Sequence, residues 1–166
     1  MGNLEILNGK KLLIVDDEPD VLETLRDLLD ACDIDTASDY ESAERLLIEN
    51  EYDLAILDIM GVRGYDLLEI ATQKHISALM FTARALSSND FAKSMRAGAI
   101  AYIPKQEMSE IASYVADLLA ARQAGVERPG NWYQRLKSFF EKQFGSDWLA
   151  HYKQAGKKID WMDFDV

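Results

Sequence analysis

Short apolar runs alternate with amphipathic stretches from residue 11 to residue 123, and this alternation constrains the fold more than any other feature of the chain. Each apolar run has the length of a strand, and each following stretch carries apolar residues at helical spacing. The runs that we interpret as strands are 11–15, 34–37, 54–57, 78–81 and 101–103. Strands that alternate with helices in this way form βαβ units, whose strands lie parallel in one sheet.

We therefore predict a doubly wound, flavodoxin-like α/β fold with five parallel strands in the order 2-1-3-4-5. The first helix is expected to begin at Pro19, because proline favours the first turn of a helix. Its expected apolar face consists of Val21, Leu22, Leu25, Leu28, Leu29 and Cys32. The later helices are expected over 41–50, around 67–71, between Ser87 and Gly98, and over 111–122. Ser87 and Asp90 have the spacing of a capping box, and Gly98 suits the residue that ends the helix.

Residues 124–130 have the composition of a linker, and a further helix is predicted beyond them. Its apolar stripe consists of Trp132, Leu136, Phe139, Phe140 and Phe144, and Gly145 is expected to end it. Ser146 is expected to cap a shorter helix that carries Trp148, Leu149 and Tyr152. The predicted organisation is thus an α/β domain over 1–123, a linker over 124–130 and a helical extension over 131–166.

The charge and the apolar content exclude several classes of function. The formal net charge is −11 at pH 7, and the surplus of acidic over basic residues lies entirely before residue 126. Because DNA binding needs a basic surface, we expect none. Cys32 is the single cysteine and is expected to be a small core residue. No segment has the length and apolar content of a signal peptide or of a membrane span, which needs roughly 20 apolar residues. We therefore expect a reducing, cytoplasmic setting without membrane contact.

Polar side chains follow four of the predicted strands. Asp16 and Asp17 follow the first strand, Asp58 the third, Thr82 the fourth and Lys105 the fifth. Because the carboxyl ends of parallel strands share one edge of the sheet, we expect these side chains to converge there. Three carboxylates favour Mg²⁺, and a fixed ammonium and a hydroxyl suit the oxygens of a phosphoryl group. Within this set Asp58 is the expected nucleophile, since an aspartate can form an acyl phosphate.

In these motifs the sequence resembles the receiver domains of two-component response regulators over about residues 10–123. The motifs are Val15-Asp16-Asp17-Glu18-Pro19, Leu57-Asp58, Thr82-Ala83 and Tyr102-Ile103-Pro104-Lys105. The resemblance implies that Asp58 accepts a phosphoryl group and that Asp16, Asp17, Asp58 and the backbone carbonyl of Met60 hold Mg²⁺. It further implies that Thr82 and Lys105 contact the phosphoryl oxygens and that Tyr102 is a switch residue moving with Thr82.

The same resemblance implies the partners. A sensor histidine kinase or a phosphotransfer protein would donate the phosphoryl group, and a downstream protein of unknown identity or a second copy of this chain would bind the switched surface. The domain would be no enzyme beyond its own phosphorylation and dephosphorylation.

Two departures from the family pattern are visible. The segment from Asp58 to Tyr65 is about two residues shorter than usual, with Gly61 where proline is common, so we expect a tighter loop beside the metal site. Gln106 follows Lys105 where the family commonly has proline, and Pro104 precedes it. The cis Lys–Pro peptide of the family cannot form here.

Two other functions fit part of the pattern. A Mg²⁺-dependent phosphohydrolase with an aspartyl-phosphate intermediate, as in the haloacid dehalogenase superfamily, needs an acid two residues after its nucleophile. Met60 occupies that position and cannot transfer a proton. A scaffold that keeps the receiver fold without being phosphorylated is the second alternative. For the extension, packing on the receiver, a dimer contact and a phosphorylation-controlled output or docking element all stay open.

Overall fold

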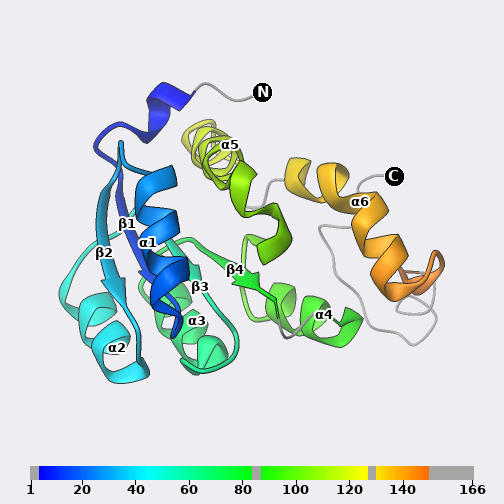
Figure 1. Cartoon of the computed structure of the whole chain (residues 1–166), viewed down its shortest axis with the longest axis horizontal. Helices are drawn as coiled ribbons and strands as arrows, with labels where there is room; N and C mark the ends of the chain where they lie inside the picture. The colour runs from blue at the N-terminus through cyan, green and yellow to red at the C-terminus, as the bar shows by residue number, and fades with distance from the viewer. Residues whose placement is uncertain (1–3, 84–86, 127–129, 150–166) are drawn as a thin grey trace.

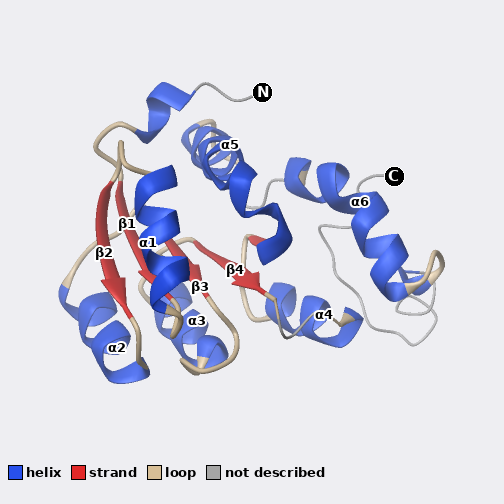
Figure 2. Ribbon diagram, in the orientation of Figure 1, coloured by secondary structure: helices blue, strands red, loops and turns tan. Residues whose placement is uncertain are grey.

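The computed structural model describes residues 4–83, 87–126 and 130–149. Five parallel strands form one sheet in the order β2-β1-β3-β4-β5, with helices on both of its faces (Figure 2). The strands are β1 (Lys11–Val15), β2 (Asp33–Ala37), β3 (Leu54–Leu57), β4 (Ala78–Thr82) and β5 (Ala101–Pro104). The predicted number, direction and order of the strands are confirmed.

The main helices alternate with these strands. They are α1 (Pro19–Leu28), α2 (Tyr40–Glu49), α3 (Gly64–Gln73), α4 (Ser88–Arg96), α5 (Ile111–Gln123) and α6 (Asn131–Phe144), with short 3-10 turns η1 (Leu4–Leu7) and η2 (Lys105–Glu110). Helices α1 and α5 contact each other on one face of the sheet, and α2 and α3 contact each other on the other (Figure 1). Helix α6 lies beyond α4 and α5, at the β5 end of the sheet (Figure 1).

The core lies on both faces of the sheet. Every residue of β3, β4 and β5 is buried, as are the last four of β1. Strands buried on both faces need no alternation of polar and apolar residues, which is why they read as continuous apolar runs. Only β2, at one edge of the sheet, is half-exposed over most of its length.

The first helix differs from the prediction at one position. Val21 and Leu25 are buried as expected, but Leu28 is 37% exposed. Leu28 is the last residue of α1, and Leu29 leaves the helical conformation with φ −116° and ψ 33°. Leu29 is buried as predicted, although it follows the helix in a non-helical conformation, whereas Leu28 does not join the core. Cys32 is half-buried against the core, and burial raises the pKa of its thiol to about 11.

The predicted ends of α4 and α6 are confirmed. The Ser87 hydroxyl accepts a hydrogen bond from the Asp90 backbone N–H and donates one to the Asp90 carboxylate. Gly98 follows α4 with a φ of +111°, and Gly145 follows α6 with a φ of +97°. The shorter helix predicted at 146–152 runs beyond the described residues, and Tyr152 and Trp161 lie outside them.

Candidate functional site

The polar residues expected at the strand ends lie at the carboxyl edge of the sheet. Asp16 and Asp58 each continue the hydrogen bonding of the strand that they follow: the Asp16 N–H donates to the Ala37 carbonyl at 3.1 Å, and the Asp58 N–H to the Val15 carbonyl at 3.0 Å. Thr82 is the last residue of β4, and Lys105 follows β5 directly. Asp16, Asp58 and Thr82 are buried, whereas Asp17 is exposed.

Lys105 joins the carboxylates of three different residues. Its Nζ lies 2.6 Å from Asp16 Oδ2, 3.0 Å from Asp58 Oδ2 and 3.2 Å from Glu18 Oε1, and its side chain is only 9% exposed. The Asp58 carboxylate is further fixed, because its Oδ1 accepts a hydrogen bond from the Ile59 N–H at 2.8 Å. The Asp16 Oδ1 accepts one from the Glu18 N–H at 2.9 Å. The strand ends and the following turns thus hold Asp16, Asp58 and Lys105 in fixed positions.

Burial and charge act in opposite directions on the protonation of this group. Burial raises the pKa of the Asp16 carboxyl, and the hydrogen bond from Lys105 only partly offsets this effect. Burial alone would lower the pKa of the Lys105 ammonium, but its hydrogen bonds and charge interactions with Asp16 and Asp58 outweigh burial and raise it. The lysine therefore stays charged, while an unbalanced negative charge remains around Asp16.

A metal ion fits this set of oxygen atoms. One carboxylate oxygen from each of Asp16, Asp17, Glu18 and Asp58 can be chosen so that all four lie within 4.8 Å of one another. Carboxylate oxygens are ligands that Mg²⁺ prefers, and Mg²⁺ keeps several waters when only a few of them bind it. A divalent cation would also relieve the repulsion among these carboxylates, which Lys105 neutralises only in part.

Thr82 also fits a site that binds a ligand. Its side chain is fully buried, and its Oγ1 has no hydrogen-bond partner among the described residues. A buried hydroxyl without a partner costs free energy and calls for an explanation, such as a group that binds there. An anion bound near Asp58 would accept the hydrogen bond that this hydroxyl can donate.

The loop between β3 and α3 is compact, as the shortened sequence predicts. The Gly64 N–H donates to the Ile59 carbonyl at 3.0 Å, which closes the loop over only a few residues. A Cβ at Gly64 would collide with the Asp58 carbonyl, and a Cβ at Gly61 would collide with the Asp17 carboxylate. Gly61 also has a φ of +86°, which favours glycine. Met60, two residues after Asp58, is 49% exposed.

Tyr102 lies in β5, in register with Met80 of the neighbouring strand, and is fully buried. Burial raises the pKa of its hydroxyl. Its ring lies 5.3 Å from that of Phe91, measured between centroids, and this contact joins β5 to α4. After Lys105 the chain forms η2, and no peptide bond among the described residues is cis.

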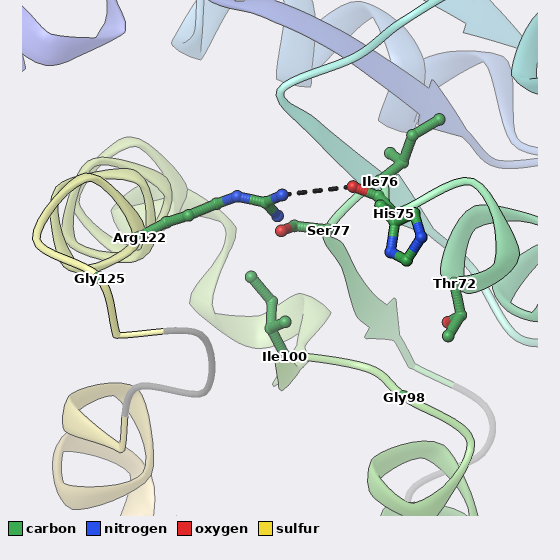
Figure 3. Close-up of a pocket in the computed structure, with 8 residues that line it drawn as sticks. All are labelled: Thr72, His75, Ile76, Ser77, Gly98, Ile100, Arg122 and Gly125. Atoms are coloured by element: carbon green, nitrogen blue, oxygen red, sulfur yellow. Dashed lines mark hydrogen bonds between the residues drawn. The ribbon is translucent and has the colours of Figure 1, made fainter.

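A cavity of about 390 Å³ lies at the opposite edge of the sheet (Figure 3). Its lining comes from residues that precede β4 and β5 and from the end of α5: Thr72, His75, Ile76, Ser77, Gly98, Ile100, Arg122 and Gly125. Arg122 already donates a hydrogen bond to the His75 carbonyl at 3.2 Å. None of the polar residues at the carboxyl edge lines this cavity, so it is separate from the acidic site.

Comparison with known proteins agrees with this geometry. The sequence profile of the response regulator receiver domain matches residues 12–116. The chain belongs to this family. The receiver is 31% identical over 127 residues to the response regulator protein PilR of Pseudomonas aeruginosa, a match that covers 73% of this chain. It covers only 28% of PilR, so this chain spans less than a third of that relative's length.

Solved receiver domains share the fold. A CheY-like receiver domain from Methanospirillum hungatei superposes with a TM-score of 0.65 at 23% identity, covering 71% of this chain and 99% of that one. The BeF3-activated receiver domain of DrrB, a Thermotoga maritima protein, gives a TM-score of 0.60 at 22% identity, with 68% of this chain and 98% of that one covered. In each case more than a quarter of this chain lies outside the shared region.

Glu18 is the site residue that the strand-end argument missed. It is one residue beyond the acidic pair, at the start of α1, and reaches Lys105 from there. The sequence did contain a signal, since an acidic residue in the same turn as Asp16 and Asp17 remains close to them. Within the described part of the chain, no helix has both the length and the apolar character that a membrane span requires.

Proposed function

We propose that the receiver accepts a phosphoryl group on Asp58, with Mg²⁺ bound by Asp16, Asp17, Asp58 and the backbone carbonyl of Met60. The observation that carries this proposal is the position of the Asp58 carboxylate, 3.0 Å from a buried ammonium and within 4.8 Å of three further carboxylates. When bound, Mg²⁺ supplies positive charge to the phosphoryl oxygens. Glu18 is close enough to take part, either as a ligand or through Lys105.

In the proposed reaction a carboxylate oxygen of Asp58 attacks the phosphorus atom of a phosphohistidine. The new P–O bond forms an acyl phosphate, and the P–N bond breaks with its electron pair going to the histidine nitrogen. Phosphoryl transfer depends mainly on positioning and on neutralising charge. Two observations support roles for Lys105 and Thr82. The ammonium lies beside Asp58, and the buried hydroxyl has no partner among the described residues, so both can donate to phosphoryl oxygens.

The proposed donor is a sensor histidine kinase or a phosphotransfer protein, and Thr82 and Tyr102 are the proposed switch residues. The switched surface would bind a downstream protein or a second receiver. We also propose the division into a receiver over 1–123, a linker over 124–130 and an extension over 131–166. Met60 argues against a phosphohydrolase, because a thioether in the position of the general acid cannot transfer a proton.

Intact mass spectrometry tests the acceptor directly. The full chain is incubated with acetyl phosphate or phosphoramidate, with Mg²⁺ or with EDTA. We expect one phosphoryl adduct with Mg²⁺ and none with EDTA, since only a cation offsets the repulsion among the carboxylates. Asp58→Asn should abolish the adduct, whereas Asp66→Asn, an exposed control in α3, should leave it unchanged. An equal adduct on the Asp58→Asn variant would refute the assignment, and no adduct on any variant would favour the scaffold.

A further inference from the structure

Helix α6 packs its apolar face against the receiver. The buried side chains of the helix are Trp132, Tyr133, Leu136 and Phe140. They cover a surface of the receiver formed by α4, β5 and α5, which we call the α6 seat and define by Phe91, Tyr102 and Tyr114. All three seat residues are at most 2% exposed, and α6 lies alongside α4 and α5, the helices that carry Phe91 and Tyr114 (Figure 1).

Phe91 is the centre of this contact. Its ring lies 5.0 Å from that of Phe140, 5.1 Å from Trp148 and 5.9 Å from Trp132, measured between centroids. On the receiver side the ring of Tyr102 lies 5.3 Å away, edge to face. Aromatic pairs in this geometry are attractive beyond the area that they bury. Helix α6 is therefore held by a close-packed cluster that includes the proposed switch residue.

Arg135 of α6 contacts three side chains on or next to α5. Its guanidinium stacks on the Tyr114 ring at 3.8 Å, donates to Asp117 Oδ2 at 3.3 Å and lies 3.8 Å from Glu110 Oε1. A third of the side chain is exposed, so each ion pair alone is weak. The three contacts together place one positive charge of the extension between two negative charges of the receiver.

The seat is connected to the acidic site through the chain itself. Thr82 ends β4, Ser87 caps α4, and Phe91 lies one turn into that helix. Tyr102 contacts the Phe91 ring and precedes Lys105 by three residues. The seat therefore includes residues of β5 and of α4, the helix that follows β4, and both strands end at the carboxyl edge. A displacement of Thr82 toward an anion on Asp58 would act on β5, which pairs with β4, and through β5 on Tyr102 and its contact with Phe91.

We propose that α6 is a tethered ligand of the α6 seat that favours the receiver with Asp58 unmodified, and that phosphorylation of Asp58 loosens α6. This inference rests on the proposed function. In the arrangement that α6 covers, the Lys105 ammonium pairs directly with the unmodified carboxylates of Asp16 and Asp58, a pairing that a phosphoryl group on Asp58 would have to rearrange. Close-packed rings tolerate displacement poorly, so a moved Phe91 fits α6 less well.

The coupling must act in both directions. If an anion on Asp58 weakens the docking of α6, then weaker docking of α6 must strengthen the binding of that anion by the same factor. The proposal therefore predicts that a receiver with a loosened α6 is easier to activate. It also predicts that the seat becomes accessible to an amphipathic helix of another chain only after activation.

Hydrogen–deuterium exchange of the full chain tests the first direction. Exchange is followed by mass spectrometry with Mg²⁺ alone and with Mg²⁺ plus beryllofluoride, an analogue of the phosphoryl group. We expect the amides of α6 to exchange about fivefold faster with beryllofluoride, as a coupling of typical size gives. The amides of α2, which lies at the far end of the sheet from α6, are the internal reference and should not change (Figure 1).

Arg135→Glu tests the reverse direction, because it places a third negative charge beside Glu110 and Asp117 without altering the aromatic cluster. Lys142→Glu is the matched control, with the same change of charge at an exposed position of the same helix. Circular dichroism verifies that both variants fold, and fluorine NMR of bound beryllofluoride gives the affinity. We expect about fivefold tighter binding by Arg135→Glu and an unchanged affinity for Lys142→Glu.

Three other outcomes would contradict these proposals. Unchanged exchange in α6 at full occupancy of Asp58, or equal affinities of the two variants, would show that α6 is a static cover. Slower exchange with weaker binding by Arg135→Glu would show that α6 favours the activated state, which also overturns the proposal. If the wild-type chain binds no more beryllofluoride than the Asp58→Asn variant, the proposed function itself is refuted.

Discussion

Gly61 lies where the backbone of the loop between β3 and α3 passes beside the carboxylate of Asp17. The contact leaves no room for a methyl group, and the positive φ of this residue adds a second reason for glycine. The loop is shorter than is usual for receivers, so its backbone crosses close to the proposed metal ligand. At the scale of single residues, the position of the Asp17 carboxylate thus depends on a neighbour without a side chain.

We predict that Gly61→Ala weakens Mg²⁺ binding about tenfold or more, because its Cβ displaces the Asp17 carboxylate. Gly9→Ala is the matched control, since Gly9 also has a positive φ of 74° but has open space within 4 Å of the position that a Cβ would take. Both variants should lose about 1–2 kcal/mol of stability from the left-handed conformation. Calorimetric titration with Mg²⁺ measures the affinity, and equal affinities of the two variants would contradict the prediction.

The residues at the strand ends could be predicted because the sequence and the topology act together there. Asp16, Asp58, Thr82 and Lys105 each follow an apolar run, and a parallel sheet brings such positions to one edge. The bonds among them could not be predicted, because they depend on side-chain rotamers. Glu18 reaches Lys105 only through the conformation of the first turn of α1, which the pattern of apolar residues does not specify.

Among the elements, the end of α2 is bound to the end of α3 by the side chain of Lys74. The Lys74 ammonium, just after α3, donates hydrogen bonds to three carbonyls at the end of α2: Leu47 at 2.6 Å, Ile48 at 2.9 Å and Asn50 at 3.1 Å. The last carbonyls of a helix have no partner within the helix and carry partial negative charge. One half-buried lysine thus donates hydrogen bonds to three backbone carbonyls at the end of a neighbouring helix.

We predict that Lys74→Met lowers the free energy of unfolding by about 1–3 kcal/mol, because three carbonyls lose a charged donor. The apolar part of the side chain is largely retained, so the loss reports the ammonium. Lys142→Met, at an exposed position of α6, is the control and should change stability by less than about 0.5 kcal/mol. Urea denaturation measures both, and similar midpoints for the two variants would show that the tie is dispensable.

Most elements could be predicted from apolar periodicity, but the end of α1 and the turn η2 could not. The predicted strands differ from the observed ones by one residue at most, since strands buried on both faces form clear apolar runs. Helix α1 ends one turn earlier than its apolar stripe suggests, and Leu29 then enters the core in a non-helical conformation. The turn η2 after Lys105 had no periodic signal, because it is short and contains no buried residue.

At the scale of the whole molecule, the receiver and the extension share one core, but all the tryptophans lie in the extension. All three tryptophans of the chain follow residue 125, whereas residues 1–125 contain none. Trp132 and Trp148 are nevertheless buried against Phe91 of α4. Tryptophan emission therefore reports the docking of α6, and far-ultraviolet circular dichroism reports mainly the receiver.

We predict that both signals change in a single unfolding transition of the wild-type chain, because the aromatic cluster is continuous with the receiver core. Phe140→Ala should separate them, since it removes the ring that contacts both Phe91 and Tyr102 and costs about 3–5 kcal/mol of packing. The emission transition should then occur at lower urea concentration than the dichroism transition. Separate transitions in the wild-type chain would show that the extension is an independent unit.

The covered face also shapes how this chain can diverge over generations. An exposed surface can change one residue at a time, but Phe91 and the rings above it fill a shared volume. A larger or smaller side chain on one side of that contact needs a compensating change on the other, because effects at touching residues are not additive. We therefore expect substitutions at Phe91 and at the rings that cover it to occur in compensating pairs during evolution.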